Sequence, residues 1–271
     1  MPELPEVETT RLGIQSYIEN QTVTQMVIRQ PQLRWPIPCN LPEQLQGKIV
    51  QRLTRRGKYL LFEMGQGALI VHLGMSGSLG ILKQKTAPKK HDHVDIMFAN
   101  NIVLRFTDPR RFGSILWAEG AFLQHALLAK LGVEPLTTDF SAQYLWHAAQ
   151  RRKKSIKSFI MDNHIVVGVG NIYATEALFL AGIHPQRPAG LVSEIEMTKL
   201  VDVIKNILTK AIQQGGTTLK DFVNGEGKPG YFSQQLQVYG RQGFPCFSCN
   251  KILQSMRIGQ RTSVYCLYCQ V

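Results

Sequence analysis

The sequence contains no apolar run that approaches the length of a membrane span. A helix needs about 20 consecutive, mostly apolar residues to cross the hydrocarbon layer. The N-terminus also lacks the basic stretch followed by an apolar stretch that marks a secretory signal. These two absences argue against membrane insertion and secretion, so we expect a cytoplasmic protein of the bacterial type.

Acidic residues are scarce relative to basic ones. The chain has 19 Asp and Glu against 31 Lys and Arg, which gives a formal net charge of +12. This excess is larger than solubility alone requires, and it favours a polyanionic partner. We expect a nucleic acid, ahead of an anionic membrane surface.

Cysteine is rare as well, and four of the 5 cysteines form two Cys-x-x-Cys pairs near the C-terminus. Cys246 pairs with Cys249, and Cys266 pairs with Cys269 after a gap of sixteen residues. Four thiolates on two turns suit tetrahedral Zn²⁺, and the lack of a nearby fifth ligand predicts a closed, structural site. Two disulfides or two redox pairs are the alternatives, which a cytoplasmic location disfavours. Cys39 stands apart, and we interpret it as a free thiol.

Two kinds of pattern divide the chain. Short apolar runs separated by turn signals predict an antiparallel sandwich or barrel, packed against an amphipathic helix over residues 5–19. The expected strands are 22–29, 49–55, 59–64, 68–73, 77–82, 94–98, 102–107 and 114–118. Beyond residues 132–135 the spacing predicts helices over 142–151, 156–161, 172–181 and 195–213. The last helix opens with a capping box, Ser193 and Glu196, and ends at Gly215-Gly216.

The expected fold class is therefore α+β. A chain of 271 residues can form more than one domain with its own core. We expect an N-terminal antiparallel β-sandwich with a flanking helix over residues 1–133 and a hinge over 134–140. A helical domain over 141–230 and a zinc finger over 231–271 follow.

The first residues are Met1-Pro2-Glu3-Leu4-Pro5-Glu6. If Met1 is removed, which a small second residue permits, Pro2 becomes an N-terminal secondary amine. An α-amino group has a pKa of about 8, so about a tenth of it is unprotonated at pH 7 and can attack an electrophilic carbon. The resulting iminium is an electron sink, and Glu3 is a candidate acid or base. The alternative is that the prolines only mark the helix start, which we accept for Pro5.

The segment Gly168-Val169-Gly170-Asn171 predicts a tight turn before a helix. The glycines allow a phosphate to approach the backbone, and Asn171 at the N-cap would lie where the helix attracts an anion. A capped turn without a ligand is the alternative. The basic run 151–154 and Lys157 precede this turn. They could be surface charge, but beside a phosphate turn they favour a stripe that faces DNA.

The loop Thr107–Gly113 carries Arg110 and Phe112. On a rigid loop, such a ring can wedge into a base step while the guanidinium fills the vacated space. Met75 is a second wedge candidate, although a methionine in a loop more often packs in a core. Arg261 lies between the two cysteine pairs, and we expect it to offer a guanidinium to phosphate.

Three histidines and one lysine complete the candidates. We interpret His72 as a phosphate contact, because no helix presents it with further metal ligands. We interpret His91 and His93 as structural. We also count His91 among the candidate DNA contacts. Lys58 begins a strand, and it is either surface charge or a basic group near the substrate.

Together these segments resemble the bacterial formamidopyrimidine-DNA glycosylases, also called 8-oxoguanine DNA glycosylase/AP lyases. The resemblance runs from Pro2 to Gln270. It rests on the four-cysteine finger and, in this order, on Pro-Glu-Leu-Pro-Glu-Val-Glu-Thr, Arg-Arg-Gly-Lys-Tyr-Leu, His-Leu-Gly-Met-Ser-Gly, Lys-His-Asp-His-Val-Asp, Thr-Asp-Pro-Arg-Arg-Phe-Gly, Gly-Val-Gly-Asn-Ile-Tyr and Leu-Gln-Val-Tyr-Gly-Arg. The chain departs from the family pattern at Val264, where the family usually has an aromatic residue.

The resemblance implies a helix–two-turns–helix domain after the sandwich, one structural Zn²⁺ and duplex DNA with oxidised bases or abasic sites as the partner. It implies that Pro2 attacks C1′ of the damaged nucleotide, that Glu3 is the acid for sugar-ring opening and that Glu6 supports them. Lys58 would lie near the lesion and is counted with the catalytic residues. Arg261 is counted with the catalytic residues as well as the DNA contacts. The enzyme would act on the nucleoid as a monomer.

The remaining implied roles concern DNA. The gap left by the flipped base would be filled by Met75, Arg110 and Phe112. Phosphates would be held by His72, Asn171 and Arg261, and Lys157 would lie where the lesion approaches. Residues 217–230 would cover the extruded purine.

Two alternatives remain open at this point. The related endonuclease VIII group removes oxidised pyrimidines, but Leu4-Pro5 and the set of Met75, Arg110 and Phe112 favour the branch that acts on purines. A non-catalytic DNA-binding protein with a zinc finger would bind DNA without forming a covalent intermediate.

Overall fold

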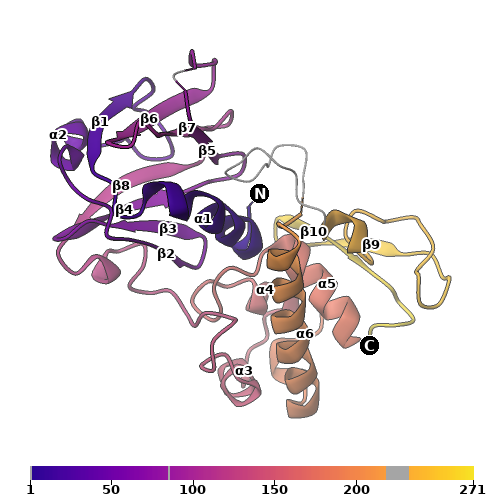
Figure 1. Ribbon diagram of the computed structural model, residues 1–271. Coiled ribbons are helices and arrows are strands. Elements are labelled where there is room, and N and C mark those ends of the chain that lie inside the picture. The colour runs from indigo at the N-terminus through magenta and orange to yellow at the C-terminus, as the bar shows by residue number, and fades with distance from the viewer. Residues whose placement is uncertain (1, 85, 218–231) are drawn as a thin grey trace. The chain divides into compact units, whose positions relative to one another are not determined.

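The computed structural model describes residues 2–84, 86–217 and 232–271. The chain divides into two compact units (Figure 1). Among the described residues, the first unit consists of 2–129 and 214–217, and the second of 130–213 and 232–271. Each unit has its own hydrophobic core, as the length of the chain leads one to expect.

The first unit contains two antiparallel sheets of four strands each. One sheet has the order β1 (Val23–Ile28), β6 (Asp92–Phe98), β7 (Val103–Thr107) and β5 (Ser78–Leu82). The other has the order β2 (Arg52–Arg56), β3 (Tyr59–Glu63), β4 (Gly67–His72) and β8 (Ser114–Glu119). Buried side chains from both sheets and from helix α1 (Leu4–Ile18) form one continuous core. The predicted α+β class with antiparallel N-terminal sheets is confirmed.

The strands form where the sequence places apolar residues between turns. The β2–β3 hairpin is an example, because Arg56 pairs with Tyr59 and leaves Gly57 and Lys58 as the turn. Two-residue hairpin turns need positive φ, and Gly57 adopts φ 56° without the penalty that a Cβ would bring. The turn projects Lys58 from the end of the hairpin. One short helix, α2 (Leu41–Leu45), was not predicted.

The second unit is built on four helices and one hairpin. The helices are α3 (Ala142–Ala149), α4 (Ile156–Ile160), α5 (Asn171–Ala181) and α6 (Glu194–Gln213), and the hairpin consists of β9 (Gln254–Ile258) and β10 (Arg261–Tyr265). Helix α6 packs against α3 and α5. The predicted capping box is present, since Ser193 N donates to Glu196 Oε2 at 2.8 Å. Val264 lies in the small core of the finger, so the departure from the aromatic pattern is accommodated by burial.

The two compact units are defined by their residues, and the domain boundaries expected from the sequence stay a prediction. The chain passes from one unit to the other at residues 129 and 130, ahead of the expected hinge at 134–140. Residues 214–217 belong with the sheets, whereas 232–271 belong with the helices. Within the described ranges, no helix is long and apolar enough to cross a membrane.

Candidate functional site

Pro2 and Glu3, the second and third residues of the sequence, are buried in the first unit. Pro2 is buried, and Glu3, with 1% of its surface exposed, is the N-cap of α1. Glu3 and Glu6 form a reciprocal capping box, in which Glu3 N donates to Glu6 Oε2 at 2.9 Å. The start of the helix therefore fixes the backbone that carries Pro2 and places a carboxylate next to it in the chain.

Glu6 also fixes a segment that is distant in the sequence. Its Oε1 accepts hydrogen bonds from Thr217 N at 2.8 Å and from Thr217 Oγ1 at 2.6 Å. The backbone of Gly216 passes so close that a Cβ there would lie 3.1 Å from Glu6 Oε1. One buried carboxylate thus joins the N-terminal helix to the last residue before 218. Of the predicted lesion-covering segment, only Thr217 lies within the described residues.

His72 lies at the end of β4 in a positively charged environment. Burial, the Lys58 ammonium and the Arg34 guanidinium lower the pKa of His72 to about 4. Its Nδ1 accepts a hydrogen bond from Gly74 N at 2.9 Å, so the proton of the neutral ring is on Nε2. His72 at neutral pH is therefore an uncharged hydrogen-bond donor, and Lys58 and Arg34 supply the nearby positive charge.

The two wedge candidates lie on loops that touch. A Cβ on Gly74 would lie 2.4 Å from the carbonyl carbon of Phe112, so only glycine allows this approach. The Arg110 guanidinium lies 5.2 Å from the centre of the Phe112 ring, which is 45% exposed. The structure therefore brings the Met75 loop and the Arg110–Phe112 loop together, with the aromatic ring and the cation on the surface.

Asp108 organises these loops from beneath. Its side chain is fully buried, and it accepts hydrogen bonds from Ser76 Oγ at 2.7 Å and from Gly113 N at 2.8 Å. His93 is also buried, and its Nε2 lies 2.8 Å from the Asp108 carbonyl oxygen. This contact supports the structural interpretation of His93. His91 is half-buried, and its ring lies edge-on to that of His93 at 6.3 Å.

The second unit has the expected tight turn before α5, with one correction. Gly170 is the N-cap of α5, with φ −111° and ψ −159°, and Asn171 is the first helical residue. Asn171 Nδ2 donates to the Thr262 carbonyl oxygen at 3.2 Å, which connects the turn to strand β10. Asn171 therefore lies at the helix N-terminus, as an anion contact requires, but it does not cap the helix.

Lys157, predicted to face DNA, is buried, although it is among the residues that line the cleft described next. Only 1% of its surface is exposed, and its Nζ donates to Ser263 Oγ at 2.7 Å and to Thr175 Oγ1 at 2.8 Å. Thr175 Oγ1 in turn donates to the Asn171 carbonyl oxygen at 2.7 Å. Lys157 thus links α4, α5 and β10 from inside the unit and positions the residues that carry the tight turn.

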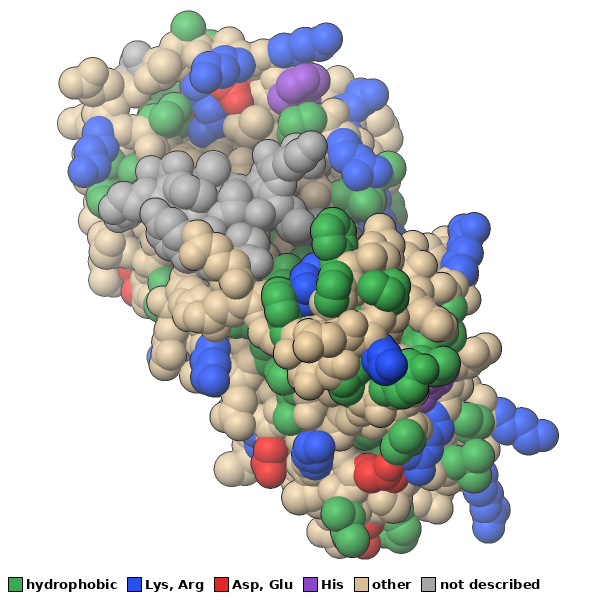
Figure 2. Space-filling view, turned by 90° about the vertical axis from the view of Figure 1, so that its right-hand side faces the viewer, with side chains coloured by type: hydrophobic (Ala, Val, Ile, Leu, Met, Phe, Trp, Pro, Cys, Tyr) green, Lys and Arg blue, Asp and Glu red, His purple; other side chains and the backbone are tan. Residues whose placement is uncertain are grey.

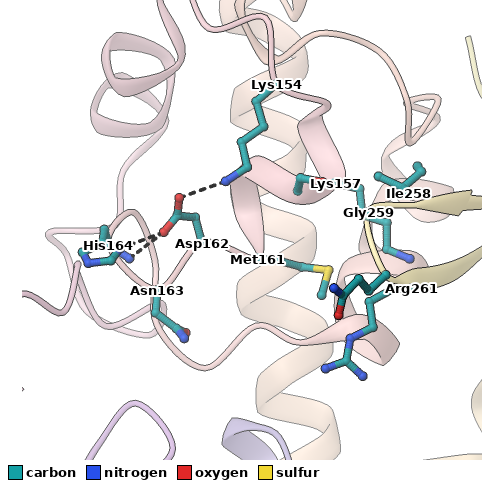
Figure 3. A pocket seen from close by; sticks show the side chains of 11 residues that line it. Lys154, Lys157, Met161, Asp162, Asn163, His164, Ile258, Gly259 and Arg261 are labelled. Carbon is teal, nitrogen blue, oxygen red and sulfur yellow. Dashed lines mark hydrogen bonds and ion pairs between the residues drawn. The ribbon is translucent and has the colours of Figure 1, made fainter. Parts of the chain in front are cut away.

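An open cleft of about 460 Å³ lies between the end of α4 and the β9–β10 turn (Figure 3). Arg261 and Lys154 are among its lining residues, together with Asp162 and His164. Partial burial opposes ionisation of Asp162, but the His164 N–H and the Lys154 ammonium outweigh it and lower the pKa of Asp162 to about 2. Asp162 is thereby engaged with its own neighbours, and Arg261 gives the turn side of the cleft a positive charge.

The four paired cysteines meet at one point. Their sulfur atoms all lie within 4.8 Å of one another, with Cys249 Sγ and Cys266 Sγ at 3.4 Å and Cys246 Sγ and Cys269 Sγ at 4.0 Å. A tetrahedral site with zinc–sulfur bonds of about 2.3 Å requires sulfur atoms about 3.8 Å apart. The cluster therefore suits a metal bound by thiolates, and Cys39 is an exposed free thiol.

Three functional side chains were missed by sequence reasoning. Arg34 reaches the surroundings of His72, and Asp108 supports the wedge loops. Glu176 accepts three backbone N–H bonds from 237–239, which fixes the chain ahead of the finger. Burial raises the pKa of Glu176, and these N–H groups act against the rise. Asp108 lies inside the loop Thr107–Gly113, two residues before Arg110, so its position in the sequence could have indicated a role. Arg34 and Glu176 lie in no such motif.

Comparison with known proteins agrees with this geometry. Residues 1–115 match the family model described as the formamidopyrimidine-DNA glycosylase N-terminal domain, and residues 131–223 match that of the H2TH domain of the same glycosylases. Formamidopyrimidine-DNA glycosylases from Photobacterium damsela subsp. piscicida and Saccharophagus degradans are 57% and 54% identical to the chain over 270 residues, and the alignments cover 100% of both proteins.

Solved structures match over the whole chain as well. The crystal structure of MutM (Fpg) from Thermus thermophilus has a TM-score of 0.89 at 34% identity and covers 99% of this chain and 98% of its own. A complex of Lactococcus lactis Fpg with DNA that contains an abasic site has a TM-score of 0.91 at 33% identity, with 99% of both chains covered. The fold and the site therefore define a DNA glycosylase. The chain belongs to the formamidopyrimidine-DNA glycosylase family, and the resemblance noted in the sequence is confirmed.

Proposed function

We propose that this enzyme excises oxidised purines, 8-oxoguanine and formamidopyrimidines, from duplex DNA in base excision repair. The observation that carries the proposal is the buried Pro2–Glu3 pair at the start of α1, fixed by Glu6, in a chain of this family. The relatives are named formamidopyrimidine-DNA glycosylases, and one related structure is a complex of a Lactococcus lactis Fpg mutant with DNA that contains Fapy-dG.

The chemistry that we assign begins once Met1 has been removed. The Pro2 nitrogen attacks C1′ of the damaged nucleotide, and the bond between C1′ and the base breaks. The base leaves with the bonding electron pair and takes up the proton that the Pro2 nitrogen loses. Glu3, held at the N-cap, donates a proton to the sugar ring oxygen as the ring opens. The product is an iminium between Pro2 and C1′. Loss of a C2′ proton then breaks the bond to the 3′ oxygen, and a second elimination releases the 5′ phosphate, which leaves a one-nucleotide gap.

DNA is held by groups from both units in this proposal. Lys58 and His72 bind phosphates near the lesion, the first as a cation and the second as a neutral donor. Asn171 and Arg261 bind backbone phosphates from the helix N-terminus and the finger turn. Their roles follow from charge and position in each unit.

The remaining DNA contacts concern the space left by the flipped nucleotide. Met75, Arg110 and Phe112 fill that space, and their touching loops and the exposed ring support this role. His91 adds an outer contact to the backbone. Lys157, being interior, acts through Ser263 and Thr175 and not on DNA directly.

We further propose that the metal of the finger is a single Zn²⁺, held by Cys246, Cys249, Cys266 and Cys269. When bound, the ion cross-links the two cysteine turns and takes no part in bond-making. The enzyme works as a monomer in the bacterial cytoplasm, at the nucleoid. The excess of basic residues supports association with chromosomal DNA before any lesion is found.

Borohydride trapping tests the proposal. Full-length protein without Met1, incubated with an 8-oxoguanine duplex and sodium borohydride, should form a covalent complex through residue 2. Pro2→Gly should lose most excision, and Glu3→Gln should bind lesion DNA without completing turnover. A Glu3→Gln enzyme with an unaltered excision rate contradicts the role of Glu3. Duplex binding without any trapped complex favours a non-catalytic zinc-finger protein, and faster excision of an oxidised pyrimidine favours an endonuclease VIII-like specificity.

A further inference from the structure

The tip of the zinc finger exposes an unusual number of large apolar side chains. Five residues on the two cysteine turns or next to them are each 51–66% exposed: Phe244, Phe247, Ile252, Leu267 and Tyr268. A single exposed apolar side chain is ordinary, but a group of this kind on one small element marks an interaction site. We call these five residues the knuckle surface.

The two cysteine turns present this surface side by side. Their sulfur atoms converge within 4.8 Å, and Pro245 pairs with Ile252 across the base of the first turn. The Lys251 ammonium lies 5.3 Å from the centre of the Tyr268 ring, which joins the first turn to the second. In Figure 2, which views the side where β9 and β10 lie in Figure 1, hydrophobic side chains gather with lysine and arginine among them.

Charge on this part of the chain has one sign. Residues 232–271 contain no Asp or Glu. Two of their cations lie over the aromatic rings of the knuckle surface, with the Arg241 guanidinium 3.3 Å from the centre of the Phe247 ring and Lys251 over Tyr268. A ligand that covers the rings therefore meets positive charge at the same place, which favours a negatively charged ligand. The Arg241 guanidinium also donates to the carbonyl oxygens of Gln237 and Pro245, which hold it in place.

The position of the surface separates it from the predicted phosphate contact. Arg261 begins β10 at the tight turn of the hairpin, whereas Tyr265 and its partner Gln254 lie at the cysteine end. Four residues of strand, at about 3.3 Å each, put about 13 Å between the two ends. Protein–DNA interfaces are polar, and phosphates do not cover large apolar side chains. Exposed aromatic rings with cations above them fit an acidic peptide better than a duplex.

We propose that the knuckle surface is a docking site for an acidic segment of another protein, one in which apolar side chains alternate with Asp or Glu. The apolar side chains of the segment pack on Phe247, Leu267 and Tyr268, and its carboxylates pair with Arg241 and Lys251. The site is independent of the glycosylase chemistry, because none of these residues belongs to the assigned catalytic or phosphate-binding set.

The test uses full-length, zinc-loaded protein and a phage-displayed library of random dodecapeptides. Phage that also bind the Phe247→Ser/Tyr268→Ser double variant are removed. Peptides that survive should be rich in Asp or Glu with aromatic or aliphatic residues among them. A fluorescein-labelled survivor, followed by anisotropy, should bind at least tenfold more weakly to Lys251→Glu, which changes only an exposed charge. Ile195→Ser, at an 84% exposed apolar position on α6, is the matched control and should bind as the wild type does.

Several outcomes overturn the proposal. One is a failure to recover any peptide that depends on Phe247 and Tyr268. Another is recovery of peptides without acidic residues, or equal binding to Lys251→Glu. Displacement of the peptide by an undamaged duplex would assign the surface to DNA and would also refute it. Zinc content and duplex affinity of each variant, expected to be unchanged, show that the finger is folded.

Discussion

Replacement of His72 by asparagine tests whether His72 contacts a phosphate as a neutral hydrogen-bond donor or as a cation. Asn retains an acceptor for Gly74 N, because its Oδ1 occupies the place of the imidazole Nδ1, but it loses the Nε2 donor. With a pKa of about 4, His72 carries no charge at pH 7. We expect His72→Asn to weaken duplex binding about tenfold, or about 1.4 kcal/mol, as loss of one hydrogen bond to a charged group does.

The salt dependence of duplex binding distinguishes a neutral phosphate contact from a charged one. Each cation that neutralises a phosphate contributes about 0.9 to the slope of log K against log salt. His72→Asn should leave that slope unchanged, whereas Arg261→Gln should reduce it by about 0.9. Fluorescence anisotropy with an abasic-site duplex between 50 and 200 mM salt, roughly the range used for such slopes, measures both. A reduced slope for His72→Asn would show that the ring is charged and would refute the argument.

The same histidine makes stability depend on pH. Its folded-state pKa, about 4, lies below its ordinary 6.5, so the unfolded chain takes up a proton first as the pH falls. The free energy of unfolding is therefore unaffected by protonation of His72 above pH 6.5, and it falls as the pH is lowered from 6.5 to 4. The difference corresponds to about 3 kcal/mol at most. Urea unfolding at pH 7 and pH 4.5 should show a smaller loss in His72→Asn, whereas His164→Asn, at a 70% exposed position, should behave as the wild type.

Three further predictions follow from buried groups. Lys157→Met should lower the free energy of unfolding by about 2–4 kcal/mol through loss of bonds to Ser263 and Thr175, measured by urea titration, without changing the salt slope of DNA binding. Asp108→Asn should slow lesion excision more than it weakens binding to undamaged duplex, because Asp108 accepts the hydrogen bonds that hold the two wedge loops. Single-turnover excision and duplex binding measure the two effects, and equal effects would contradict this prediction. Chelation of the metal should abolish duplex affinity, whereas far-UV circular dichroism should retain the β-sheet signal of the first unit. An unchanged duplex affinity would show that the finger does not need the ion.

Much of the fold could be predicted because its signals are local. The capping box of Ser193 and Glu196 operates within a few residues, and it was found where the sequence indicated. Lys58, expected at the start of a strand, lies instead in the turn just before β3. Helix α2 spans only 5 residues, too few for a helical period to show. The N-cap of α5 was misplaced by one residue, because Asn is preferred at that position and Gly170 adopted the extended conformation instead.

What the sequence did not indicate at the site depends on contacts between distant segments. Lys157 stands beside a run of exposed cations, and nothing local distinguishes it from them. Its acceptor on Ser263 lies 106 residues away, and that contact makes it interior. Arg34 was missed for the same reason, since its influence on His72 depends on packing that a single sequence does not display. Charged residues in a sequence reveal the sign of a surface, but not which members of a run turn inward.

The hydrogen bonds between Glu6 and Thr217 constrain when the enzyme can mature. The ribosome must deliver residue 217 before the first helix can be clamped at its start, so the leading end stays accessible for most of translation. In the proposed mechanism Met1 must be removed, and Pro2 is buried once the fold is complete. The mechanism therefore favours removal of Met1 before the bonds between Glu6 and Thr217 form.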